Sequence, residues 1–200
     1  MYEPVSQRWQ TQRTTGDIPP ISENQCVVGI QGDDNTYEVG PNSLPFQDSL
    51  TSGQIFIYGG QLNGDVQKTV ENGAVWVLSL PSFSWHKQSN PLAVGRYMHS
   101  CNIAGKSQMI SVGGVAFLPD TPDSGFNTAG GTTDPWDQGL GVLDMSTLQW
   151  KSSYDPSADD YTTPQIVKDY IQRNGQYPAW RSSTLRRWFV DQGTCRELSH

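Results

Sequence analysis

The chain contains an internal repeat, and this repeat restricts the possible folds more than any other feature of the sequence. Residues 74–85 (AVWVLSLPSFSW) align without a gap with residues 139–150 (GLGVLDMSTLQW). Each copy follows a short apolar segment that ends in two glycines, QIFIYGG at 54–60 and QMISVGG at 108–114. An ordered recurrence of this kind is typical of repeat architectures, in which each unit buries its apolar surface against its neighbour.

Each unit is predicted to contain four short strands. An apolar run with an early cysteine opens each unit, ENQCVVG at 23–29 and MHSCNIAG at 98–105. The QIFIY segment is apolar on both faces, as expected of a strand that lies between packed sheets. Four short strands separated by turn residues indicate an antiparallel sheet, and such sheets are the blades of a β-propeller. Trp9 lies 17 residues before Cys26, much as Trp85 lies 16 before Cys101, so Trp9 closes a partial third copy.

The glycine pair after an apolar strand, followed by another strand and a closing tryptophan, resembles the kelch repeat. The motif residues are Gly59, Gly60 and Trp85 in one unit and Gly113, Gly114 and Trp150 in the other. The resemblance implies a galactose-oxidase-like propeller similar to fungal ectodomain proteins that are often membrane-anchored. We therefore predict an all-β fold over residues 1–155: a partial kelch-type propeller of about two four-stranded blades, at about 22–90 and 95–155, plus one extra strand.

Residues 156–200 are predicted to form an acidic loop and a helical appendage. The segment TPQIVKDYIQRNG has Thr163 as the expected N-cap, Pro164 as the first helical residue and Asn174-Gly175 as the stop. A second short helix is expected within 182–189. A propeller closes with about four to eight blades. We therefore expect a truncated gene product, with a piece cut from a longer chain or assembly from several copies as alternatives.

Charge and composition restrict the partners. The formal net charge of −7 argues against nucleic-acid binding. No run approaches the ~18 apolar residues of a membrane span, and the N-terminus lacks the apolar region of a secretory signal. The sequence therefore assigns no compartment, although the full-length proteins that it resembles are associated with membranes or the cell surface.

The tripeptide His99-Ser100-Cys101 could be mistaken for a catalytic cluster. Neighbouring side chains on a strand point to opposite faces, so Ser100 and His99 cannot form a nucleophile pair, whereas His99 and Cys101 share a face. When Cys101 is aligned with Cys26, His99 aligns with Asn24 of the other unit. A cysteine in both units indicates a small buried site at that position. A disulfide is not expected, because equivalent positions in adjacent blades should lie beyond the ~7 Å Cα limit for such a bond.

No catalytic residue, metal ligand or cofactor is predicted. The histidines, His86, His99 and His200, do not show the clustered spacing of a copper-radical oxidase on this fold. The aspartates near 155–160 lack the spacing of a calcium loop and are expected to be solvated.

The remaining function is binding. Two insertions, near 33–53 and 116–137, join the predicted blades at opposite ends. They carry the candidate binding residues Tyr37, Phe46, Phe126 and Trp136, as well as Phe117, unless these rings fold back over the blade edges. The sequence thus predicts a non-catalytic module, part of a larger propeller, that binds a protein or carbohydrate ligand. The alternative is a degenerate relative of a galactose-oxidase-like copper enzyme that lacks its metal site.

Overall fold

The structure of the chain is a computed structural model that describes residues 1–3, 6–32, 53–62, 73–89, 95–116, 136 and 140–190. The strands are β1 (Tyr2–Glu3), β2 (Arg8–Trp9), β3 (Thr15–Gly16), β4 (Ser22–Glu23), β5 (Cys26–Gln31), β6 (Gly53–Tyr58), β7 (Gln61–Leu62), β8 (Val75–Leu80), β9 (Ser84–Gln88), β10 (Arg96–Tyr97), β11 (Ser100–Ala104), β12 (Gln108–Val112), β13 (Val115–Ala116), β14 (Leu140–Asp144) and β15 (Gln149–Lys151). The helices are α1 (Gln165–Asn174) and α2 (Ser183–Phe189). The fold is therefore all-β with two short helices, as the repeat pattern predicts.

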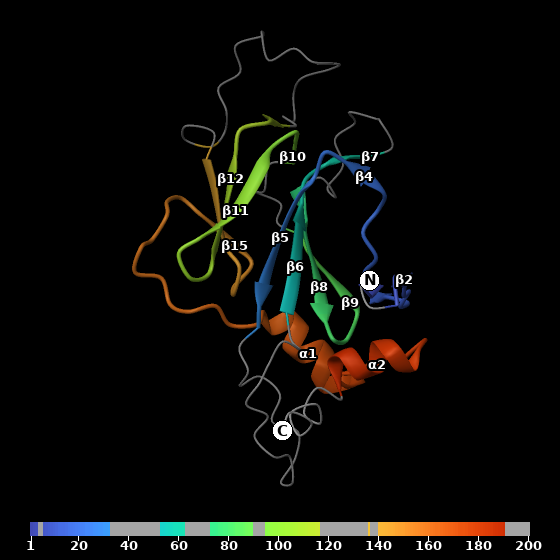
Figure 1. Ribbon diagram of the computed structural model, residues 1–200. Coiled ribbons are helices and arrows are strands. Elements are labelled where there is room, and N and C mark those ends of the chain that lie inside the picture. Colours follow the sequence, from blue (N-terminus) through green and yellow to red (C-terminus); the bar gives the residue numbers. More distant parts are fainter. Residues whose placement is uncertain are drawn as a thin grey trace, which may run out of the picture.

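Two antiparallel sheets form the body of the molecule. The first blade has the strand order β9-β8-β6-β5, and β3 extends it through a parallel pairing with β9. The second blade has the order β11-β12-β14-β15. Both are four-stranded meanders, and Figure 1 shows them next to each other with α1 and α2 at one end. This arrangement is consistent with the predicted all-β, partial kelch-type fold.

The pairing registers show which residues of the two blades are equivalent. Cys26 pairs with Tyr58 in the first blade, and Ser100 pairs with Val112 in the second. Tyr58 and Val112 each stand directly before a glycine pair, so the residue equivalent to Cys26 is Ser100. The alignment of the two cysteines with each other was therefore wrong by one residue. On a strand, one residue changes the face of the sheet to which a side chain points.

The partial third copy is present as the hairpin β1–β2. Tyr2 pairs with Trp9 just as Leu78 pairs with Trp85 in the first blade. The turn residue Gln7 has a φ of 53°, and Phe83 has 52° at the matching place. This hairpin therefore repeats the two outer strands of a blade, and its Trp9 is 76% exposed.

The core lies between the two blades. The first blade contributes Phe56, Tyr58, Val75 and Val77, and the second contributes Met109, Leu143, Met145 and Leu148. Helix α1 closes this core with Val167 and Ile171, while Ile166 and Tyr170 pack against it. These four side chains therefore form one apolar face of the helix. Neither helix in the described part of the chain is long and apolar enough to cross a membrane.

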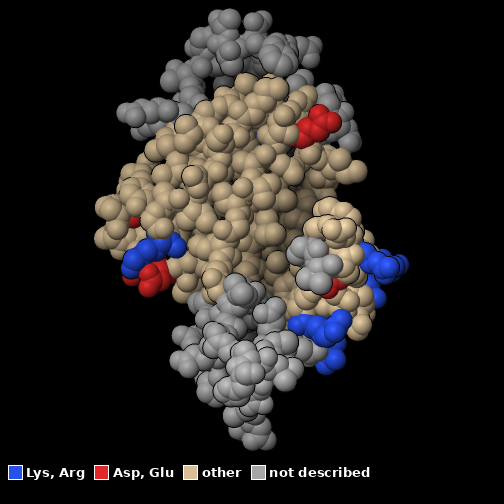
Figure 2. Space-filling model, viewed as in Figure 1, with Lys and Arg blue, Asp and Glu red and all other residues tan. Residues whose placement is uncertain are grey.

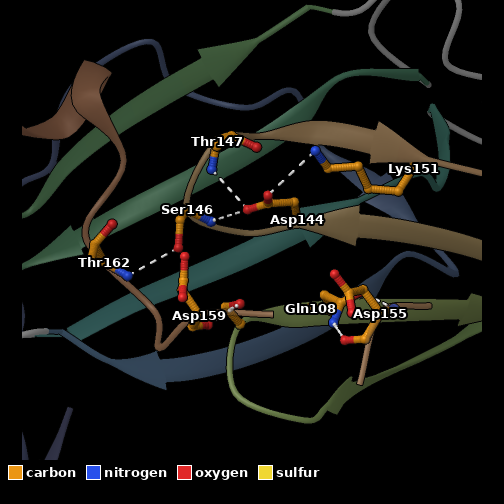
Figure 3. Close-up of polar contacts among 9 residues, drawn as sticks. Gln108, Asp144, Ser146, Thr147, Lys151, Asp155, Asp159 and Thr162 are labelled. Atoms are coloured by element: carbon orange, nitrogen blue, oxygen red, sulfur yellow. Dashed lines mark hydrogen bonds and ion pairs between the residues drawn. The ribbon is translucent and has the colours of Figure 1, made fainter. Parts of the chain in front are cut away.

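Residues 152–163, called the strap below, are held against the blades (Figure 3). The side-chain amide of Gln108 donates to the Asp155 carbonyl at 2.6 Å and accepts from the Asp155 N–H at 3.0 Å. In the first blade the equivalent Gln54 accepts a hydrogen bond from the hydroxyl of Tyr161 at 3.0 Å. The glutamine that opens QIFIYGG and QMISVGG thus binds the strap in both units.

Helix α1 begins one residue later than the sequence predicts. Pro164, with an extended ψ of 145°, is the N-cap in place of Thr163, and its carbonyl accepts from the Lys168 N–H. Thr163 is only 2% exposed. The helix ends at Asn174-Gly175 as expected, and Gly175 has a φ of 87°. In α2, Ser182 caps the helix by accepting from the Leu185 N–H at 3.1 Å.

Candidate functional site at the junction between the blades

The innermost strands β5 and β11 lie next to each other, and a disulfide joins Cys26 to Cys101 with their Cα atoms 5.5 Å apart. The expectation that no disulfide forms was wrong for two reasons. The cysteines occupy non-equivalent positions, so Cys26 and Cys101 point to opposite faces of their own sheets and therefore toward each other. The inner strands also approach closely enough for a bond, within the usual ~4.4–6.8 Å range of Cα separations.

His99 lies beside this disulfide and is 8% exposed. Its ring makes an edge contact with Tyr58, with the ring centroids 5.2 Å apart. The motif glycines provide the space: a Cβ on Gly59 would lie 2.5 Å from His99 Cε1, and one on Gly114 would lie 2.7 Å from His99 Cβ. Gly59 of one pair and Gly114 of the other thus both leave the space that the His99 side chain occupies.

The alternation predicted for this strand is confirmed. Tyr97 and His99 are buried and Cys101 is half-buried, whereas Met98 and Ser100 are exposed. The Ser100 hydroxyl therefore points away from the His99 imidazole. This geometry excludes a serine–histidine nucleophile pair at this position.

Burial makes both described histidines neutral at physiological pH. Desolvation and the positive charge of Arg96, partly opposed by a hydrogen bond to the Tyr58 backbone, lower the pKa of His99 to about 4. Desolvation also lowers the pKa of His86 to about 4, with Asp17 opposing. His86 Nε2 is hydrogen-bonded to the Ser84 hydroxyl at 2.9 Å, but neither ring nitrogen of His99 makes a hydrogen bond of normal geometry to a described residue.

Trp136 is the one candidate binding residue that the structure describes, and its ring is half-buried in the junction. It lies over the Arg96 guanidinium at 4.4 Å and near the Trp150 ring at 4.9 Å. A Cβ on Gly141 would lie 2.4 Å from its indole. Gly141 is equivalent to Trp76 of the first blade. The Trp136 indole, which comes from the insertion, therefore packs beside a position where the second blade has glycine in place of tryptophan. Trp136 thus folds back onto the second blade, which is the alternative to ligand binding given above for these aromatic rings.

The other candidate aromatics, Tyr37, Phe46, Phe117 and Phe126, lie outside the described residues. The first insertion joins the first blade where Gln31 pairs with Gly53. The second insertion lies between β13 and β14, at the end of the second blade where Val112 pairs with Leu140. In equivalent blades these are opposite ends of the sheet, as the strand order predicts. Binding by these aromatics stays a prediction.

The junction also forms a group with the composition of a metal site. The sulfur atoms of Cys26 and Cys101 and a ring nitrogen of His99 all lie within 4.8 Å of one another. Strand alternation pairs His99 with Cys101 from sequence alone. The position of Cys26 beside them depends on a further fact: Cys26 and Cys101 lie one residue apart in otherwise equivalent strands. Aligning the two cysteines with each other does not show this offset.

The aspartates of the strap are engaged by the protein itself. The Asp155 carboxylate accepts from the Ser157 N–H and hydroxyl at 2.8 and 2.7 Å, which lowers the pKa of Asp155. Asp160 pairs with Lys106 at 2.8 Å. Both side chains remain exposed, as expected of a solvated loop.

Comparison with known proteins agrees with this architecture. The chain is 29% identical over 159 residues to a kelch repeat-containing protein of Arthroderma benhamiae (strain ATCC MYA-4681 / CBS 112371), an alignment that covers 77% of this chain. This similarity supports a relationship between the chain and kelch-repeat proteins. This chain spans only 19% of the length of that relative. No protein-family model matches this chain.

Proposed function

We propose that this chain is a non-catalytic kelch-repeat module that belongs to a larger propeller and binds a protein partner. The observation that carries the proposal is the attachment of two long insertions to opposite ends of a framework held by a shared core and a disulfide. Loops on a rigid sheet framework are the usual binding elements of such folds. The similarity to a kelch repeat-containing protein supports a binding role.

The surface chemistry supports a protein partner. The face in Figure 2 carries few charged side chains over the sheets, and its charged groups lie mainly near the edges. Trp9, Ile18 and Ile21 are 76%, 63% and 83% exposed.

The cysteine arrangement argues against an intact copper site, which the degenerate-relative alternative also lacks. The resemblance to galactose-oxidase-like enzymes would require a cysteine linked through a thioether to a tyrosine ring. Within the described residues, Cys26 and Cys101 are instead bonded to each other. Neither sulfur is available for such a link while the disulfide is intact.

Site-specific photo-crosslinking tests the proposal. A photoreactive benzoylphenylalanine is placed at Phe46 or at Phe126, and a control is placed at Lys106, whose side chain is 63% exposed on a turn of the second blade. We expect one protein from an extract of the source organism to be cross-linked from an insertion position and not from Lys106. Equal cross-linking from all three positions, or binding on a glycan array with no protein cross-link, would contradict the proposal. Stoichiometric copper in the purified, oxidised protein would contradict its non-catalytic part.

A further inference from the structure

The Cys26–His99–Cys101 group has two properties that a disulfide alone does not require. The first is the imidazole: His99 is 8% exposed, and its ring makes at most one poorly aligned hydrogen bond, to the Tyr58 backbone, so at least one ring nitrogen has no partner among the described residues. Buried polar atoms are nearly always satisfied, so an unsatisfied one calls for an explanation. The second is proximity, because all three potential ligand atoms lie within 4.8 Å of one another.

The chemistry of the group suits one class of metal ion. Thiolate and neutral imidazole are the preferred ligands of Zn²⁺, at about 2.3 Å for sulfur and about 2.0–2.1 Å for nitrogen. Two thiolates balance the charge of Zn²⁺, so the loaded group adds no net charge beside the buried Arg96 guanidinium.

We propose that reduction of the Cys26–Cys101 disulfide converts the junction into a Zn²⁺ site with Cys26, Cys101 and His99 as ligands. A dithiol supplies the two electrons: the protein S–S bond breaks, two protein thiols form, and the dithiol becomes a disulfide. Zn²⁺ binding then releases one proton from each thiol. This proposal does not depend on the proposed binding role of the insertions.

The site has a structural consequence. Cys26 belongs to β5 of the first blade, while His99 and Cys101 belong to the segment that forms β11 of the second. Both the disulfide and a bound Zn²⁺ therefore join the same two inner strands. The metal keeps the blades linked under reducing conditions, where the covalent bond is lost.

Cobalt binding to the full chain tests the proposal. Co²⁺ replaces Zn²⁺ as a spectroscopic probe, a phosphine serves as a reductant that does not compete as a thiol, and Cys195→Ser removes the third cysteine. We expect the reduced protein to bind one Co²⁺ with sulfur-to-cobalt charge-transfer absorption, and the oxidised protein to show none. His99→Ala should weaken Co²⁺ binding by roughly tenfold or more, in line with losses seen when metal sites are altered. His86→Ala, at the buried histidine of the other blade, should leave it unchanged.

A second measurement covers the case in which His99→Ala does not fold. In the reduced protein with its native His99, Zn²⁺ should slow alkylation of both Cys26 and Cys101 and raise the midpoint of thermal unfolding. The absence of cobalt charge-transfer absorption together with the absence of zinc protection would overturn the proposal. Equal Co²⁺ affinity in folded His99→Ala and His86→Ala would also overturn it, because His99 would then not be a ligand.

Discussion

The first and second blades pair their strands in the same register but place equivalent residues in different surroundings. Cys26 and Val28 of the first blade face the junction, and their equivalents Ser100 and Asn102 lie on the outward face of the second blade. His86 is buried, whereas its equivalent Lys151 is exposed. The residue type at each position thus depends on whether a neighbour covers that face of the blade: covered positions hold the less polar residue of each pair, which is the expected pattern of burial.

The two motif glycines of the second blade give the largest expected contrast. Gly114→Ala should destabilise the fold by roughly 4 kcal/mol or more, because the new Cβ would lie 2.5 Å from the Tyr97 carbonyl oxygen in addition to the cost of a positive φ. Gly113→Ala, at a φ of 68° with open space around it, should cost only about 1–2 kcal/mol. Urea unfolding measures both losses of stability. Equal losses would show that the close approach of Gly114 to Tyr97 and His99 does not affect stability.

Loss of the disulfide is expected to be the next largest effect. The bond closes a sequence separation of 75 residues, and the entropy of a loop of that size corresponds to about 4 kcal/mol. Cys26→Ala with Cys101→Ala should therefore lower the unfolding free energy by up to this amount in metal-free buffer. Chemical unfolding measures the loss, and Cys195→Ser is the control. An unchanged unfolding midpoint in the double variant would show that the blades do not depend on the bond.

The pH dependence compares one histidine from each blade. For both His86 and His99 the folded-state pKa of about 4 lies below the usual 6.5. The unfolded chain therefore binds more protons between these values, and stability is complete above pH 6.5 and falls as the pH falls toward 4. We expect a loss of up to about 1.4 kcal/mol per pH unit for each histidine in this window. Thermal unfolding across this range should show a reduced slope in either His86→Gln or His99→Gln; an unchanged slope in both would contradict burial of the neutral rings.

An exchange of residues tests the comparison of the two faces directly. Val28→Asn places an amide at a position that is 8% exposed and should cost about 2–3 kcal/mol. Asn102→Val, at the equivalent exposed position, should change stability by less than about 0.5 kcal/mol. Chemical unfolding of both variants gives the result. A large loss from Asn102→Val would mean that the outward face of the second blade is covered.

The glutamines that bind the strap should show the smallest difference. Gln108→Ala removes two hydrogen bonds to the Asp155 backbone and should cost about 2 kcal/mol. Gln54→Ala removes the bond from Tyr161 and should cost about 1 kcal/mol. Amide hydrogen exchange should report faster exchange at Asp155 in the Gln108 variant only. Equal exchange in both variants would show that the strap is held by other contacts.

Much of the fold could be predicted from the spacing of a few residues. The glycine pairs, the closing tryptophans and the apolar alternation predict the blades because strand periodicity and positive φ angles are local properties. The sequence places the N-cap of α1 one residue too early, at Thr163 instead of Pro164, because Thr163 is buried and does not cap the helix. Tertiary burial outweighed a local capping preference.

The junction could be predicted only in part. Alternation places His99 and Cys101 on one face, and the structure confirms that assignment. The disulfide and the packing of Trp136 over Gly141 depend on contacts between segments far apart in the chain. No local pattern around Cys26 or Trp136 specifies those partners.

By itself, the sequence determined the repeat, the four-stranded units and the division of His99, Ser100 and Cys101 between two faces, since each follows from local backbone geometry. Only the tertiary structure decided that Cys26 and Cys101 meet and that His99 joins them. The reason is that Cys101 lies one residue beyond the position equivalent to Cys26, which puts the two cysteines on opposite faces of their sheets, and this offset becomes visible only when the strands of both sheets are paired.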